Sequence, residues 1–123
     1  MSDVKRSARV AEGLMQELAV LVSQTLRDPR VQGAVIARVD MSDDLRQARV
    51  YVRALEGGDD VRKKEMIEGL ERASGVLRRE ATRALKLRVA PELKFFYDDG
   101  QDKRSRVDRL LLEIEHESKS KGK

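Results

Sequence analysis

Basic side chains gather around a Ser-Gly pair in the segment LERASGVLRREATRALKLR, residues 70–88. Its cationic residues are Arg72, Arg78, Arg79, Arg83, Lys86 and Arg88. Four of these residues follow one another at spacings of seven, four and three, which places them on one face of a continuous helix: Arg72, Arg79, Arg83 and Lys86. Guanidinium and ammonium groups arranged in this way bind phosphate oxygens, so the segment indicates an anionic partner such as a nucleic acid. A solvated charged face without a partner is the simpler alternative.

Ser74 and Gly75 interrupt this helical segment near its centre. Glycine costs about 1 kcal/mol relative to alanine in a helix interior, whereas a serine hydroxyl accepts hydrogen bonds from N–H groups at a helix start. The pair therefore predicts that one helix ends and a second begins here. The second helix would offer free N–H groups and the positive end of its dipole to a phosphate near Ser74 and Gly75. Gly75 would either hold a backbone geometry that alanine resists or let the anion approach the backbone closely.

Two apolar stripes predict the helices that position this segment. A first helix is expected from Ser7, whose hydroxyl can cap it, to near Asp28, because Pro29 disfavours helical geometry in the residue before it. Its apolar face consists of Val10, Leu14, Leu18, Leu21, Val22 and Thr25. The second stripe runs through both helices of the kinked pair and consists of Val61, Met66, Ile67, Leu70, Ala73, Leu77, Ala81, Ala84 and Leu85. Pro91 ends that block.

Three segments alternate as strands do. Residues 34–42 and 46–55 flank the turn sequence SDDL and predict an antiparallel hairpin. In the first strand, Val35, Ala37, Val39 and Met41 are expected to share one face. In the second strand, Ala48, Val50, Val52 and Ala54 are expected to face the core. A third strand over residues 92–99 would place Leu93, Phe95 and Tyr97 on one face.

The resulting order, α-β-β-α-kink-α-β, predicts an α+β fold of two layers in which helices cover a small three-stranded sheet. The outer face of that sheet is expected to remain solvated. Residues 1–116 are expected to form one domain, and their last part, 102–115, has the pattern of a short helix. That helix would carry Val107, Leu110, Leu111 and Ile114. The polar tail 117–123 has nothing to bury and is expected to be disordered.

Composition narrows the classes of function. The chain has 123 residues, of which 39% are charged and 3% aromatic, and its formal net charge of +4 favours an acidic partner. It has no cysteine, which excludes disulfides, thiolate catalysis and cysteine-based zinc sites and fits a reducing cytoplasm. No apolar run approaches the ~20 residues of a membrane span, and the charged N-terminus is unlike a secretory signal. We therefore expect a cytoplasmic monomer with no membrane partner.

Residues suited to catalysis or to holding a cofactor are scarce. His116 is the one histidine and lies in the polar tail, which excludes a three-histidine metal site. The acidic pairs at 43–44, 59–60 and 98–99 suit turns and helix caps, and no phosphate-binding loop of the GxxxxGK type occurs. We therefore expect no enzymatic activity, no cofactor and no metal. Phe96 remains a candidate for stacking on a base.

The chain resembles ribosome-binding factor A, a family of bacterial ribosome-assembly proteins, from residue 9 to residue 112. The resemblance rests on RVAEGLMQELAVLVSQTLRDPRV (9–31), VDMSDDLRQARVYV (39–52), LERASGVLRRE (70–80) and PELKFFYDD followed by RVDRLL, in that order. It implies a fold like the type II KH domain, in which an Ala-x-Gly kink replaces the usual Gly-x-x-Gly loop. Ala73-Ser74-Gly75 matches that kink. The resemblance also implies binding to the free small (30S) ribosomal subunit and help in the maturation of its RNA.

The first hypothesis is therefore a non-catalytic assembly factor that holds a segment of immature 16S ribosomal RNA until the segment has folded. Phosphate contacts are expected from Lys5, Arg6 and Arg9 at the start of the first helix. Further contacts are expected from the kinked helices, at Arg72, Ser74, Gly75, Arg78, Arg79, Arg83, Lys86 and Arg88. One alternative is a helix-turn-helix-like DNA-binding protein. Another is a protein-interaction module, whose binding would hardly change with salt.

Overall fold

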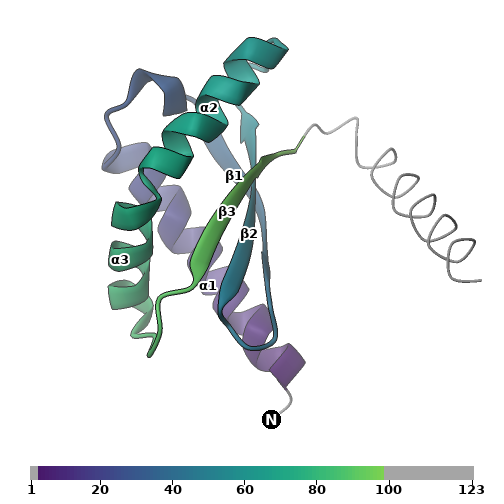
Figure 1. The fold of residues 1–123 in the computed structure, drawn as a ribbon, viewed down its shortest axis with the longest axis vertical. Coiled ribbons are helices and arrows are strands. Elements are labelled where there is room, and N and C mark those ends of the chain that lie inside the picture. The colour runs from purple at the N-terminus through teal and green to yellow at the C-terminus, as the bar shows by residue number, and fades with distance from the viewer. Residues whose placement is uncertain (1–2, 99–123) are drawn as a thin grey trace, which may run out of the picture.

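The computed structural model describes residues 3–98, which form three helices packed on one sheet (Figure 1). The elements are α1 (Asp3–Gln24), the 3-10 turn η1 (Pro29–Val31), β1 (Ala34–Met41), β2 (Gln47–Ala54), α2 (Asp60–Arg72), α3 (Ser74–Leu85) and β3 (Glu92–Tyr97). This order confirms the predicted α-β-β-α-kink-α-β arrangement. The expected helix 102–115 and the tail 117–123 lie outside the described residues, so the domain boundary at residue 116 stays a prediction.

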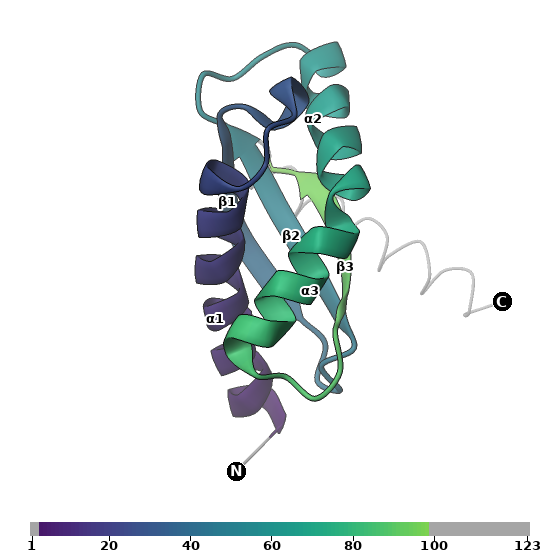
Figure 2. The ribbon, with the colours of Figure 1, turned by 90° about the vertical axis from the view of Figure 1, so that its left-hand side faces the viewer.

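The sheet has the strand order β1-β2-β3. β1 and β2 form the predicted antiparallel hairpin, whereas β3 runs parallel to β2. A parallel neighbour requires a crossover connection, and α2 and α3 supply it. All three helices lie in front of the sheet in Figure 2, so one face of the sheet is covered and the other is not covered by any described element. The fold is thus the predicted α+β arrangement of two layers.

The core lies between the helices and the covered face of the sheet. β2 alternates as expected, with Ala48, Val50, Val52 and Ala54 buried. The helices contribute Leu14, Leu18, Val22, Met66, Leu70, Leu77 and Ala81, and β3 contributes Leu93 and Phe95. The predicted stripes are confirmed at these positions. They are wrong at Thr25 and Ala84, which are exposed, and at Val61, which lies in the first turn of α2 and is 64% exposed.

The predicted face of the first strand is wrong. The register of β1 against β2 shifts between Ile36 and Arg38, which marks a β-bulge. Ile36 and Val39 are buried on the two sides of this shift, and Val35 is 44% exposed. A bulge adds one residue to one strand, so the side chains after it exchange faces with those that simple alternation predicts.

The bounds of the first helix also differ from the prediction. α1 begins at Asp3, so Ser7 is a buried helical residue and not the cap. The helix ends at Gln24, before the region of Asp28. Asp28 instead caps η1, because its carboxylate accepts a hydrogen bond of 2.9 Å from the backbone N–H of Arg30. Pro29 therefore does not end α1, and it instead occupies the first position of η1, where proline is favoured.

Candidate nucleic-acid interface

The helix break lies at a single residue, Ala73, between the end of α2 and the start of α3. The backbone N–H of Ala73 donates to the carbonyl of Gly69 (3.2 Å), and the N–H of Leu77 donates to the carbonyl of Ala73 (3.0 Å). The predicted kink is confirmed. The predicted cap is wrong, because Ala73 occupies the N-cap position and no side chain hydrogen-bonds to the start of α3. The N–H groups of the first turn of α3, which a helix cannot pair internally, therefore have no side-chain cap.

Gly75 is not held in a conformation that requires glycine. The backbone has positive φ at three glycines among the described residues, and Gly75 is not one of them. Among the described residues, a Cβ atom built on Gly75 meets no atom within 4 Å outside its own stretch of helix backbone. The expectation of a geometry that alanine resists is therefore wrong. The other expectation, that Gly75 lets an anion approach the backbone closely, stays a prediction. The absent side chain leaves the backbone at the start of α3 open to such an approach.

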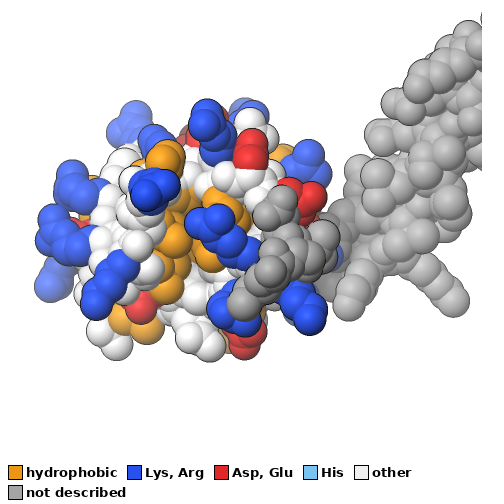
Figure 3. All heavy atoms as spheres, turned by 90° about the horizontal axis from the view of Figure 1, so that it is seen from below, with side chains coloured by type: hydrophobic (Ala, Val, Ile, Leu, Met, Phe, Trp, Pro, Cys, Tyr) orange, Lys and Arg blue, Asp and Glu red, His pale blue; other side chains and the backbone are white. Residues whose placement is uncertain are grey.

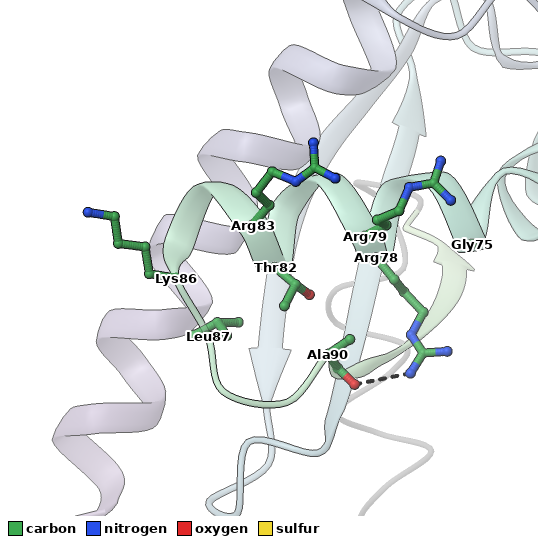
Figure 4. Close-up of a pocket in the computed structure, with 8 residues that line it drawn as sticks. All are labelled: Gly75, Arg78, Arg79, Thr82, Arg83, Lys86, Leu87 and Ala90. Carbon is green, nitrogen blue, oxygen red and sulfur yellow. Dashed lines mark hydrogen bonds between the residues drawn. The ribbon is translucent and has the colours of Figure 1, made fainter.

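A hollow on the outer side of α3, which we call the α3 hollow, has a volume of about 480 Å³ (Figure 4). Its lining consists of Gly75, Arg78, Arg79, Thr82, Arg83, Lys86, Leu87 and Ala90. The lining residues of α3 recur every three or four positions because one helix face forms the wall. The hydroxyl oxygen of Thr82 is buried in this wall and has no hydrogen-bond partner. Sequence reasoning missed Thr82, although its position three residues after Arg79 placed it on the basic face.

Two neighbouring arginines at the α3 hollow have different surroundings. The Nε of Arg78 donates to the carbonyl of Pro91 (2.8 Å), and its Nη2 donates to the carbonyl of Ala90 (3.0 Å). In Figure 4, Arg78 points toward Ala90, whereas Arg79 and Arg83 point away from it. Arg78 therefore ties α3 to the segment that leads into β3. Its guanidinium is occupied by the protein itself.

Glu80 is the acidic residue nearest to the exposed cations of α3. Its carboxylate lies 4.0 Å from the Nε of Arg79 and 3.7 Å from the Nη1 of Arg83. Exposed pairs at such distances contribute little to stability, typically below ~1 kcal/mol. One carboxylate between two guanidinium groups, with exposed Lys86 beyond them, leaves this face positive. The face is suited to bind an anion.

Lys86 ends α3 with a φ of 55°, in the left-handed region, and its N–H donates to the carbonyl of Arg83 (3.2 Å). Glycine is the usual residue at such a position because a side chain strains the backbone there. A lysine in this place keeps a cation beside the α3 hollow. Arg88 follows in the exposed segment after α3.

The start of α1 lies at the same end of the molecule as the end of α3. A Cβ atom on Gly13 would come within 2.9 Å of Leu85, so the two helices are in contact there. Arg6 and Arg9 precede Gly13 by seven and four residues and share its helix face. Lys5, Arg6 and Arg9 are exposed. Figure 3 shows Lys and Arg side chains around this end, with few acidic side chains between them.

Arg72 does not share the basic face of α3. It belongs to α2, and the break at Ala73 turns the direction of the following helix (Figure 2). Its charge acts on Asp28, where it is one of the causes that lower the pKa of that carboxyl. The structure therefore leaves Arg72 apart from the α3 hollow, where it brings together Gly75, Arg78, Arg79, Arg83 and Lys86. Of the three arginines there, Arg78 is the one whose guanidinium is bound to backbone carbonyls.

Each of the three acidic pairs noted in the sequence contains a residue with a structural partner. Asp59 caps α2 by accepting from the N–H of Arg62 (2.8 Å), and Asp44 accepts from the N–H of Arg46 (3.0 Å) in the hairpin turn. Asp98 is buried and lies 3.7 Å from Arg53. Within residues 3–98, no group of three or more His, Asp or Glu could hold a metal ion. No helix in the same range is long and apolar enough to cross a membrane.

Comparison with known proteins places the chain in one family. A family model described as ribosome-binding factor A matches residues 6–111. The ribosome-binding factor A of Sorangium cellulosum is 47% identical over 112 residues, which cover 90% of each chain. The crystal structure of ribosome-binding factor A from Thermus thermophilus superposes with a TM-score of 0.64 at 27% identity, covering 74% of this chain and 94% of that one.

A third relative is a homology model of the Thermus thermophilus ribosome-binding factor A, fitted into the cryo-electron microscopy map of a complex with the 30S subunit. It superposes with a TM-score of 0.54 at 26% identity, covering 74% of this chain and 89% of that one. The predicted family and the KH-like fold agree with these matches. This chain belongs to the ribosome-binding factor A family.

Proposed function

We propose that this protein binds the free small ribosomal subunit through its 16S RNA and assists the maturation of that RNA without catalysing a reaction. The observation that carries the proposal is the α3 hollow, where exposed Arg79, Arg83 and Lys86 stand beside the open backbone at Gly75. The relative fitted into a 30S complex supports the choice of subunit. The family is one of binding factors, which supports a role without catalysis.

The mode of binding follows from the lining of the α3 hollow. Cationic side chains bind phosphate oxygens, and uncapped N–H groups at a helix start add donors for the same anion. None of these groups reads a base, so the site would recognise the shape and charge of a folded RNA backbone more than its sequence. The protein would act as a cytoplasmic monomer that occupies an immature RNA segment and leaves when the segment has folded.

The helix-turn-helix alternative is less well supported. The break between α2 and α3 comprises one residue, Ala73, whereas a helix-turn-helix uses a turn of about three or four residues. β3 also lies directly after α3 and pairs with β2, so α3 is part of a crossover between strands. A competition experiment with duplex DNA would separate the two functions.

The direct test is co-sedimentation with purified ribosomal subunits at several salt concentrations. We expect binding to the free small subunit, weaker binding to assembled ribosomes, and a log–log salt slope near −3 if about four phosphates are contacted at ~0.7 each. The double variant Arg79→Glu/Arg83→Glu should lose about tenfold or more in affinity, the equivalent of about one charged hydrogen bond. Its melting temperature should stay close to that of the wild type because both side chains are exposed.

A matched control keeps the change in net charge and alters its place. Arg27→Glu/Lys64→Glu also reverses two exposed cations, but neither lies at the α3 hollow. This variant should bind the subunit nearly as the wild type does. Equal losses in both double variants would mean that only total charge matters, and sedimentation mainly with the large subunit would overturn the proposal.

A further inference from the structure

The uncovered face of the sheet carries aromatic and cationic side chains. The helices lie on the other face (Figure 1). The strand residues on the uncovered face, which alternate with the buried ones, come from all three strands. The residues of this face are Val35, Arg38 and Asp40 from β1, Gln47, Arg49, Tyr51 and Arg53 from β2, and Glu92, Lys94 and Phe96 from β3. We call this surface the sheet platform. The α3 hollow lies in the helical layer, so the two surfaces are separate.

A row of three stacked groups crosses the middle of the sheet platform. Arg38 pairs in register with Tyr51, and Tyr51 pairs with Phe96, so each strand contributes one side chain. The Tyr51 and Phe96 rings are stacked, with centroids 5.4 Å apart and planes at 27°. The guanidinium of Arg38 lies 4.2 Å from the centroid of the Tyr51 ring. Neighbouring groups orient each ring, and Phe96 is still 41% exposed.

This use of aromatic residues is unusual for so small a core. The whole chain has two Phe and two Tyr residues, and one residue of each type stands on the uncovered face. An exposed phenylalanine forgoes the stabilisation of about 1.5–3 kcal/mol that its full burial would give. Exposed rings that are already stacked and oriented are the platforms on which single-stranded nucleic acids place their bases.

Two cations lie two residues before the Tyr51 and Phe96 rings along their strands, on the same face of the sheet. Arg49 and Lys94 are opposite each other in the parallel register of β2 and β3, and both are exposed. Like charges at such positions destabilise a sheet. Asp40 lies 3.2 Å from Arg38 and Asp98 lies 3.7 Å from Arg53, whereas the described residues show no ion pair for Arg49 or Lys94. An anion bound across this pair would remove their repulsion.

We propose that the sheet platform binds single-stranded RNA, with a base stacked on Phe96 and the adjoining phosphates held by Arg49 and Lys94. A protein partner fits this face less well, because the centres of protein interfaces are depleted in charged residues. Here Arg38, Arg49 and Lys94 surround the two rings, and Val35 is the only aliphatic residue of the surface defined above. The proposal adds a second RNA contact to the proposed function and does not depend on the α3 hollow.

The test measures the binding of fluorescein-labelled hexauridylate and hexaadenylate to the full chain by fluorescence anisotropy. Base stacking contributes ~1–3 kcal/mol per base, so Phe96→Leu should weaken binding at least about fivefold while keeping an apolar side chain of similar burial. Arg49→Gln/Lys94→Gln should lower the magnitude of the salt slope by about 1.4, at ~0.7 for each lost contact. The melting temperature of Arg49→Gln/Lys94→Gln should equal or exceed that of the wild type, because the repulsion between the two charges is removed. The melting temperature of Phe96→Leu should stay close to the wild type, because Phe96 is 41% exposed.

The design separates this proposal from the proposed function. In the Arg79→Glu/Arg83→Glu background, Phe96→Leu should still cause its fivefold loss of oligonucleotide affinity, even where subunit binding has failed. Unchanged oligonucleotide affinity in both Phe96→Leu and Arg49→Gln/Lys94→Gln would overturn the proposal. Nuclear Overhauser contacts between the Phe96 ring and the methyl groups of Leu110 or Leu111 in the free protein would also overturn it. They would show that segment 102–115 of the same chain is the occupant of this face.

Discussion

Gly69 in α2 and Gly75 in α3 are six residues apart and meet opposite surroundings. A Cβ atom on Gly69 would lie 2.9 Å from Cγ1 of Val31 and 3.2 Å from Cβ of Arg30, whereas a Cβ atom on Gly75 meets nothing within 4 Å. We call the contact of Gly69 with residues 28–31 the η1 junction. The η1 junction needs a glycine for packing inside the protein. The α3 hollow does not, because no packing contact within residues 3–98 requires a glycine at position 75.

The arginines of the two regions differ in the same way. At the η1 junction, the guanidinium of Arg30 forms hydrogen bonds to both carboxylate oxygens of Asp28, with Nε at 3.1 Å from Oδ1 and 3.0 Å from Oδ2. At the α3 hollow, Arg79 and Arg83 share the distant carboxylate of Glu80. Arginine thus stabilises the fold at the η1 junction, whereas at the α3 hollow the arginine side chains remain available to a ligand.

The largest effect is expected from Gly69→Ala. Alanine usually stabilises a helix interior by about 1 kcal/mol, but here the new methyl group must displace Cγ1 of Val31 and Cβ of Arg30. Overpacking of this kind costs about 1–3 kcal/mol, so the free energy of unfolding in urea should fall. A Gly69→Ala protein more stable than the wild type would show that the η1 junction is loosely packed and would remove the contrast with Gly75.

The next effect is expected from Arg78→Met, compared with Arg79→Met. Arg78 donates two hydrogen bonds to the carbonyls that precede β3, and their loss should cost about 2 kcal/mol of unfolding free energy. Arg79→Met should change stability by less than ~0.5 kcal/mol, because that side chain is exposed. Subunit affinity should show the reverse order, with the larger loss in Arg79→Met. A stability loss equal in both variants would contradict the division of roles at α3.

A smaller effect is expected from pH at the η1 junction. The hydrogen bonds from Arg30 lower the pKa of the Asp28 carboxyl from 3.8 to about 2. Because the folded state favours the charged carboxylate, its contribution to stability is fully present above pH ~4 and is lost as the pH falls toward 2. The melting temperature of Asp28→Asn should therefore lie below that of the wild type at pH 6, and the difference should shrink between pH 4 and pH 2.

Asp44→Asn is the control for that experiment. Hydrogen bonds from Ser42 and from the backbone of Arg46 also lower the pKa of Asp44. The effect of Asp44→Asn on the melting temperature should therefore change over the same acidic pH range. Asp44 lies in the exposed hairpin turn, far in sequence from the helices. A difference between the wild type and Asp28→Asn that stays constant from pH 6 to pH 2 would show that the carboxylate does not act through its charge.

The sequence predicted the fold where local pattern and tertiary packing agree. Alternation in β2 identified its buried residues, and helical spacing identified Leu70, Leu77 and Ala81 across the kink. It failed in β1, because a bulge depends on the partner strand and leaves no signal in simple alternation. The strand order was also out of reach, since it depends on where the crossover places β3.

The candidate site divides along the same line. Helical spacing within α3 is enough to predict that three cations lie on the same face, namely Arg79, Arg83 and Lys86. Arg78 could not be assigned from spacing, because its partners are carbonyls 12 and 13 residues further along the chain. Ser74 fits the pattern of a cap, yet the helix start places Ala73 at the N-cap. Caps are decided by backbone angles at one residue, and these depend on how α3 packs against the sheet.

Gly75→Ala should change stability only slightly and tests most directly whether RNA approaches the backbone of α3. Its Cβ enters open space in the first turn of α3, so the variant should be more stable than the wild type by up to ~1 kcal/mol. If RNA approaches the backbone there, the added methyl group lies between a phosphate and the N–H groups of the first turn, and subunit affinity should fall although the fold is firmer. Gly75→Ala that is both more stable and equally able to bind would remove Gly75 from the site. Binding would then depend on Arg79, Arg83 and Lys86 alone. Gly75 would only lower the stability of α3 without a role in binding.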